Sequence, residues 1–170
     1  KKSPRKPGSR RDADSRAALR EEVDSLFCKG AIDPEALDPA LTVMGTVLHE
    51  AAHNLGPSHE YKVKGKTDTE TFGGPLAATF EELKAQTSSL YLAQWLADQK
   101  IIDKKMAALA HQSDIVWAFG QISQGMYAAD NTPKPYAQLA SIQVGWLLER
   151  KALTYREGET AANGRDKGCF

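Results

Sequence analysis

One helix has both of its ends marked in the sequence. Asp38 is a good N-cap, and Pro39 suits the first helical position, where its missing N–H costs nothing. Gly56 is a C-terminal stop signal, and Pro57 prevents the helix from continuing. These signals predict a helix from residue 39 to about residue 55.

This helix carries the motif HEAAH, with His49 and His53 four residues apart. Residues at that spacing share one face of a helix, so both imidazoles can be directed at a single ion. Glu50 lies one position along and can reach a water on the open side of a metal, which is the general-base role in HExxH peptidases. The motif predicts one Zn²⁺ held by His49 and His53, with Glu50 as the catalytic residue.

A catalytic zinc usually has a third protein ligand, and two candidates are open. His59 occupies the third position of the metzincin pattern HExxHxxGxxH, although no later Met-turn is evident. Glu82 lies on another predicted helix, which is the gluzincin arrangement. Gln86, four residues after Glu82, could accept an imidazole N–H and orient a ligand histidine.

The segments VLHEAAHNLG and FEELKAQTSSLYL, in that order, resemble the dipeptidyl peptidase III family of zinc metallopeptidases and its bacterial relatives. The resemblance covers roughly residues 44 to 100. It implies zinc ligands His49, His53 and Glu82, with Glu50 as general base and Glu81 as a paired glutamate that does not bind the metal. It also implies a mostly helical zinc lobe facing a β-rich lobe across a substrate cleft.

Three features depart from that family. Its best-known members have one more residue between the histidines, HExxxH. Their second motif closes on an acidic residue, where this chain has the uncharged Gln86. Family members are several times longer, and their β-rich lobe has no counterpart here, so we expect the zinc lobe alone.

The rest of the sequence predicts a mainly α domain of about five helices. Besides the HExxH helix, apolar residues at helical spacing predict helices over residues 12–27, 75–98, 103–126 and 135–151. The stretch 57–74 reads as a long loop, residues 1–11 as a basic flexible tail and 156–170 as an irregular C-terminal tail, leaving 12–155 as the zinc-binding catalytic domain. We expect the following large side chains in the core: Leu76, Phe80, Leu83, Leu90, Trp95, Trp117 and Trp146.

Charge and hydropathy argue against nucleic acid and membranes as binding partners. The formal net charge of the 170 residues is zero, which gives no general attraction to nucleic acid, and no apolar run approaches the roughly 18 residues of a membrane span. Cys28 and Cys169 lie near opposite ends and are expected to be free thiols. No signal peptide is visible, which favours a cytoplasmic location.

Stabilising a transition state needs a donor near the metal, and the candidates are His59, Tyr61, His111 and Tyr136. Together these patterns predict a zinc-dependent peptidase acting on short peptides. The alternatives are a zinc-bearing pseudopeptidase that serves as a binding or scaffold module, a metzincin-like enzyme that uses His59, and a helical domain whose HExxH is accidental.

Overall fold

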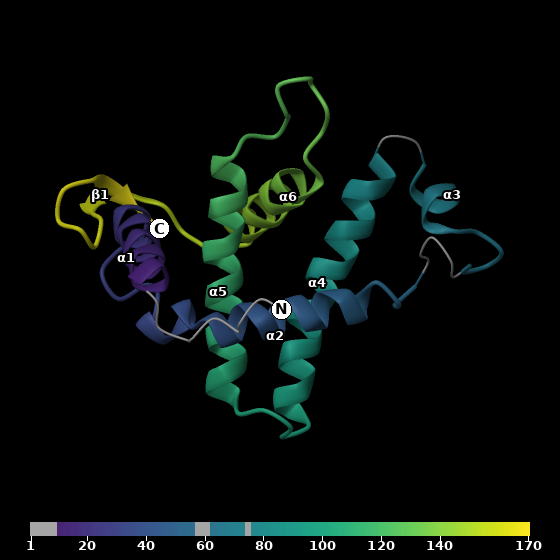
Figure 1. Ribbon diagram of the computed structural model, residues 1–170, viewed down its shortest axis with the longest axis horizontal. Coiled ribbons are helices and arrows are strands. Elements are labelled where there is room, and N and C mark those ends of the chain that lie inside the picture. The colour runs from purple at the N-terminus through teal and green to yellow at the C-terminus, as the bar shows by residue number, and fades with distance from the viewer. Residues whose placement is uncertain (1–9, 57–61, 74–75) are drawn as a thin grey trace, which may run out of the picture.

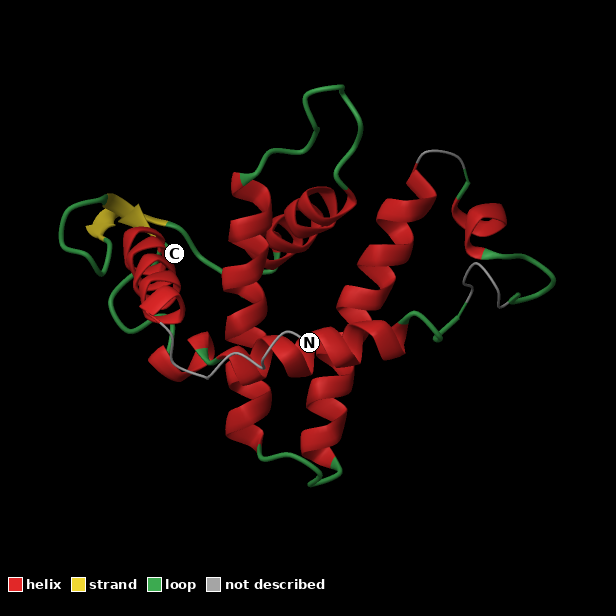
Figure 2. Ribbon diagram, viewed as in Figure 1, coloured by secondary structure: helices red, strands yellow, loops and turns green. Residues whose placement is uncertain are grey.

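The computed structural model describes residues 10–56, 62–73 and 76–170, and within them the chain is mainly helical, as expected (Figures 1 and 2). Its elements are α1 (Arg10–Leu26), the 3-10 helix η1 (Pro34–Leu37), α2 (Pro39–Ala52), α3 (Asp68–Phe72), α4 (Ala77–Asp98), α5 (Lys104–Ser123), α6 (Pro135–Glu149), and strands β1 (Arg156–Thr160) and β2 (Lys167–Cys169). No described helix is both long and apolar enough to cross a membrane.

Helices α4 and α5 form a hairpin, and α2 lies across both of them (Figure 1). Helix α6 packs against α4 and α5 as well. A hydrophobic cluster fills the junction of η1, α2, α4 and α5, with Leu41 and Leu109 among its largest members. The crossing of α2 over α4 therefore occurs in a packed environment.

The predicted boundaries of α2 are nearly correct. The Asp38 side chain accepts a hydrogen bond from Ala40 N at 2.9 Å, which confirms the N-cap. Regular helix ends at Ala52 rather than at residue 55, because Asn54 N and Leu55 N bond to carbonyls three residues back. This tighter geometry is common at helix ends.

The predicted core of α4 is wrong in part. Leu76, Phe80 and Trp95 are exposed, and so is Trp146 on α6, whereas Trp117 is half-buried as part of a second cluster. The buried face of α4 carries small or polar residues instead, namely Ala77, Thr79, Glu81, Ala85, Ser89, Ala93 and Ala97. Small side chains allow α2, α5 and α6 to approach α4 closely.

The chain's C-terminal segment also differs from expectation. Residues 156–170 are not irregular, because β1 and β2 pair as an antiparallel hairpin. Cys28 and Cys169 are not free thiols but form a disulfide that ties this hairpin to the end of α1. Phe170 packs against Phe27 and Phe119, which anchors the hairpin on the helical body.

Two further expectations concern the tails and loops. The stretch 57–74 contains the short helix α3, which opens with a capping box between Thr67 and Glu70. Helix α1 begins at Arg10, within the predicted basic tail, and residues 1–9 lie outside the described part of the chain.

Candidate metal centre

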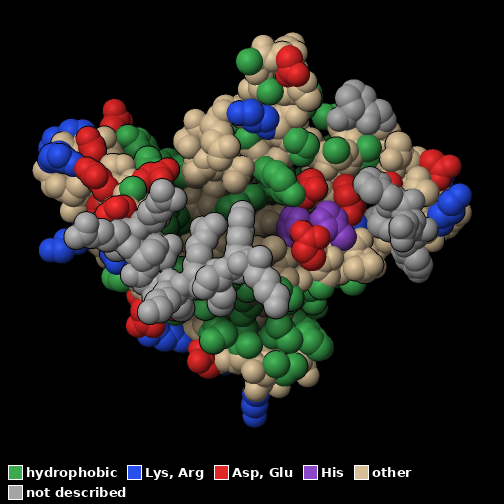
Figure 3. All heavy atoms as spheres, viewed as in Figure 1, with side chains coloured by type: hydrophobic (Ala, Val, Ile, Leu, Met, Phe, Trp, Pro, Cys, Tyr) green, Lys and Arg blue, Asp and Glu red, His purple; other side chains and the backbone are tan. Residues whose placement is uncertain are grey.

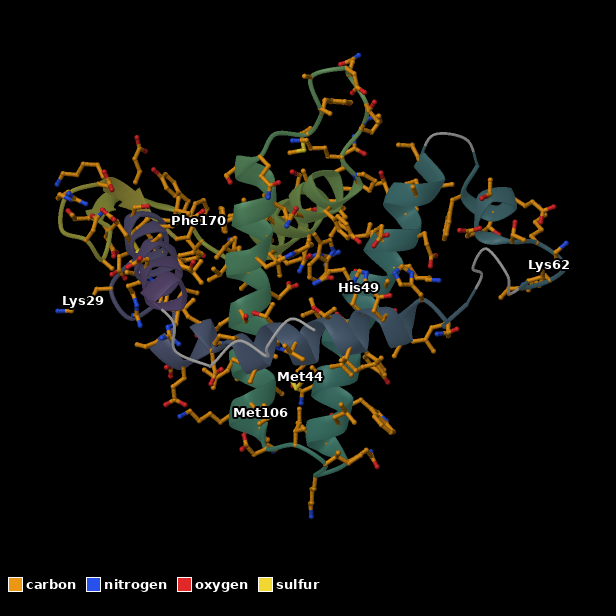
Figure 4. All side chains as sticks on the ribbon, in the orientation of Figure 1. Lys29, Met44, His49, Lys62, Met106 and Phe170 are labelled. Atoms are coloured by element: carbon orange, nitrogen blue, oxygen red, sulfur yellow. A yellow bond between two sulfur atoms is a disulfide. The ribbon has the colours of Figure 1, made fainter. Side chains whose placement is uncertain are left out.

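The crossing of α2 and α4 brings His49, His53 and Glu82 together. His49 is buried on α2, and Figure 4 shows it where α2 meets α4. His53 follows at the C-cap of the same helix, and its backbone N–H still bonds to the His49 carbonyl at 3.2 Å. The four-residue spacing therefore keeps both rings on the side of α2 that faces Glu82.

The three side chains converge on one point. The His49 Nε2 atom lies 3.2 Å from His53 Nε2 and 3.1 Å from Glu82 Oε2, and His53 Nε2 lies 3.8 Å from the same carboxylate oxygen. A tetrahedral zinc with bonds of about 2.0–2.1 Å separates neighbouring ligand atoms by about 3.3–3.4 Å. The triangle of donor atoms therefore fits a zinc ion.

The opposite nitrogen of each ring is occupied by an oxygen acceptor. His53 Nδ1 lies 2.7 Å from Glu81 Oε1, and His49 Nδ1 lies 2.7 Å from Gln86 Oε1. Since a carboxylate or amide oxygen can only accept, both Nδ1 atoms carry the proton. Both Nε2 atoms of the neutral rings then present lone pairs to each other and to the Glu82 carboxylate.

Lone pairs in such proximity require a positive charge among them. Hydrogen bonding to Glu82, with a smaller contribution from Gln86, raises the pKa of His49 against the opposing effect of burial. The same hydrogen bond lowers the pKa of Glu82. The centre thus favours a cation, which can be a proton on His49 or a metal ion bound by all three groups.

Glu81 joins the two helices at the end of α2. Its second oxygen, Oε2, lies 2.8 Å from the ammonium of Lys84, which makes an ion pair. Lys84 Nζ also donates to the His53 carbonyl at 3.3 Å, where a cation complements the C-terminal end of a helix. These contacts fix the segment that carries the second histidine, and they place Glu81 beside His53.

Sequence reasoning missed a buried carboxylate behind Gln86. Asp114 on α5 accepts hydrogen bonds from the side-chain amides of Gln86 and Gln143, and burial raises its pKa to about 6. Because the Gln86 nitrogen donates to Asp114, its oxygen is turned toward His49. One signal was present: Asp114 shares a helical face with the buried residues Ala107, Ala110 and Ala118.

Glu50 and Tyr136 lie at the same centre. A Glu50 carboxylate oxygen and one ring nitrogen from each of His49 and His53 all lie within 4.8 Å of one another, and Glu50 itself is exposed. The Tyr136 side chain lies close enough to Glu82 for each group to shift the pKa of the other, and its ring centroid lies 6.3 Å from that of His49. Desolvation, reinforced by the charge of Glu82, raises the pKa of Tyr136 and keeps its hydroxyl protonated.

The remaining predicted residues do not join the centre in the described part of the chain. His111 Nε2 lies 3.1 Å from the Leu90 carbonyl and joins α5 to α4, which is a packing contact. His59 and Tyr61 lie in residues 57–61, outside the described residues. In Figure 3, histidine side chains (purple) reach the surface beside acidic ones (red), so the centre is open to solvent.

Comparisons with protein-family models, curated proteins and solved structures find no match to this chain. The chemistry of the centre must therefore be inferred from its own atoms.

Proposed function

We propose that this chain is a zinc-dependent peptidase that hydrolyses peptide bonds of short peptides. The observation that carries the proposal is the convergence of His49 Nε2, His53 Nε2 and Glu82 Oε2 within 3.8 Å of one another. A protonated His49 would satisfy one pair of these atoms, whereas a zinc ion satisfies all three and matches their spacing. The carboxylate also offsets part of the charge of the dication.

Bound Zn²⁺ supplies Lewis acidity, which makes water an effective nucleophile near neutral pH and polarises a carbonyl group. Glu50 accepts a proton from the water as the water oxygen attacks the peptide carbonyl carbon. Glu50 then returns that proton to the departing nitrogen as the C–N bond breaks. Its exposure leaves the carboxylate accessible to both water and peptide.

Tyr136 is the described residue best placed to stabilise the transition state. Its protonated hydroxyl lies beside Glu82 and can donate to the carbonyl oxygen as negative charge develops there. In the zinc-bound chain Glu82 would be one of the residues that hold the metal, so its carboxylate would compete less for the Tyr136 hydroxyl. The donor then becomes available to the substrate.

The buried Asp114 bears on the scaffold alternative. The dipeptidyl peptidase III motif has an acidic residue at the position of Gln86. The missing negative charge in this chain is an argument for a zinc-bearing module without catalytic activity. Here Gln86 joins His49 to a buried carboxylate, so the polarisation of the histidine passes through one amide. This relay, together with Glu50, favours the peptidase.

Zinc analysis of the purified chain tests the metal. We expect about one zinc per chain, no zinc in His49→Ala/His53→Ala and strongly weakened affinity in Glu82→Ala. His111→Gln is the matched control, because it removes a histidine whose ring contacts the Leu90 carbonyl of α4 rather than a proposed ligand, and it should keep the zinc. Full zinc retention in the double variant would end the proposal.

Glu50→Gln separates the base from the metal. The amide keeps the shape but cannot accept the proton, so zinc content should persist while hydrolysis of a mixed short-peptide library falls by roughly two orders of magnitude or more. If Glu50→Gln cleaves the library as fast as the unaltered chain, then Glu50 is not the base.

A further inference from the structure

A large cavity adjoins the metal centre. It has a volume of about 640 Å³ and lies among α1, η1, α2, α4 and α5, with the start of α6 at one side. His49 and Glu50 form part of its wall, so it begins at the atoms that carry the proposed chemistry. A substrate held at the centre therefore has this cavity within reach of its neighbouring groups.

The cavity has an apolar floor. Leu41 and Ala93, with Met44 and Leu48 packed against them, belong to the hydrophobic cluster between α2 and the α4–α5 hairpin, and all four line the cavity. Tyr136 and Trp117 line it too, with ring centroids 6.2 Å apart in an edge-to-face contact. Because Tyr136 also approaches His49, aromatic surface continues from the metal centre into the cavity.

Among the described residues that line the cavity, the ionisable side chains other than His49 and Tyr136 are acidic. Glu22, Glu50 and Asp114 line it, and the described residues around it include no lysine or arginine. Away from the cation favoured at His49, a carboxylate side chain of a ligand would meet negative charge with no lysine or arginine among the described lining residues to offset it. An apolar side chain, with a positive amino group nearby, suits both the floor and the charged groups.

We propose that this cavity receives a large apolar side chain of the substrate and excludes an acidic one. The proposal rests on the proposed peptidase function, since it defines which peptides reach the centre. Burial of a leucine or phenylalanine side chain against Leu41 and Leu48 favours such residues over glycine, and hydrophobic pockets typically discriminate by about tenfold or more per lost group.

Two glycines allow the cavity to be filled. Gly45 on α2 and Gly120 on α5 both line it, and a Cβ atom added at either meets nothing within 4 Å. Gly145 on α6 has equal space but does not line the cavity. All three lie inside helices, where a side chain costs no backbone strain. Gly45→Leu and Gly120→Leu are therefore the test variants, and Gly145→Leu is the matched control.

The first readout is binding of phenylalanine amide, glycine amide and aspartic acid amide to the metal-free chain, followed by calorimetry or NMR. Phenylalanine amide should bind at least about tenfold more tightly than the other two. Gly45→Leu and Gly120→Leu should abolish that preference, while Gly145→Leu keeps it. The proposal is overturned if the unaltered chain shows no preference, or if both cavity variants fold and keep it.

The second readout is hydrolysis by the zinc-loaded chain of peptides that differ only in one residue beside the cleaved bond. Preference for phenylalanine or leucine that disappears in Gly45→Leu supports the cavity as a substrate site. Hydrolysis that is indifferent to the side chain removes this inference but leaves the peptidase proposal standing. Selective amide binding without any hydrolysis supports the cavity as a binding site. That result counts against the proposed peptidase function but not against the inference about the cavity.

Discussion

Asp114 is an acidic residue held in an apolar layer by two amides. It is 7% exposed, and each of its oxygens accepts a hydrogen bond, from Gln86 and from Gln143. Desolvation is the largest influence on this carboxyl group and raises its pKa from 3.8 to about 6, against the opposing effect of the two amides. The ionised Asp114 carboxylate, which is linked to His49 through Gln86, therefore lowers the stability of the folded state.

This cost predicts how stability depends on pH. The folded state binds the Asp114 proton more tightly than the unfolded state, so the stabilising contribution is complete below pH 4 and is lost as pH rises through about 6. A shift of this size corresponds to about 3 kcal/mol. We expect the unfolding free energy of the metal-free chain to fall by that order between pH 4 and 7, relative to Asp114→Asn, in urea titrations.

Asp114→Asn is a suitable reference because its amide can be accommodated. The Gln143 Oε1 atom is buried and has no hydrogen-bond partner among the described residues, so rotation of the Gln143 amide offers an acceptor to the new N–H. Parallel pH dependence in the two proteins would contradict the raised pKa of Asp114.

The residues of the centre divide by how they can be predicted. His49, Glu50 and His53 follow from spacing within one helix, which local sequence encodes. Glu82 and Gln86 lie on a second helix, so the sequence also predicts that they share one face of it. The contact of Gln86 with Asp114, and that of Asp114 with Gln143, depend on how α4, α5 and α6 pack, and no pattern within a single helix encodes that.

At the scale of elements, the sequence predicted the limits of the helices with strong capping signals well. It did not predict correctly which side of a helix is buried. Asp38 and Gly56 gave the limits of α2 to within a few residues. On α4, large apolar residues such as Phe80 and Trp95 point outward, because its inner face carries alanine, serine and the polar groups of the centre. The buried face of α4 thus reverses the usual relation between side-chain size and burial.

The contact between α2 and α4 makes a prediction for Gln86. Its amide orients His49 through Nδ1, so Gln86→Ala should leave the three ligands in place while weakening zinc affinity by about tenfold to a hundredfold. Gln94→Ala is the matched control, since Gln94 is an exposed residue of the same helix that bonds only to Asp98 in the described contacts. Competition with a chromophoric zinc chelator measures both affinities.

Equal zinc affinities of the Gln86→Ala and Gln94→Ala proteins would show that His49 needs no support from Gln86. Helix content by circular dichroism should be unchanged in both, which separates an effect on the ligand from a loss of α4.

At the scale of the whole molecule, the C-terminal hairpin is held against the end of α1. Cys28 and Cys169 are 141 residues apart, and Phe170 exchanges backbone hydrogen bonds with Leu26 and Cys28. The sequence does not reveal this closure, because two distant cysteines carry no spacing signal and β1 is nearly all exposed, without alternating apolar residues. A disulfide is typical of oxidising compartments and weighs against the cytoplasmic location that we expected.

The disulfide makes the last prediction. It closes a very long loop, so its removal restores much conformational freedom to the unfolded chain, and Cys28→Ser/Cys169→Ser should lower the unfolding free energy by about 2–5 kcal/mol. Zinc stoichiometry should stay near one, because the disulfide joins α1 and β2 rather than the helices that hold the ligands (Figure 1). Urea titration and metal analysis of the same samples measure the two effects, and dithiothreitol should destabilise the unaltered chain equally. A double variant as stable as the unaltered chain would mean that the backbone hydrogen bonds and the packing of Phe170 hold the hairpin without the disulfide.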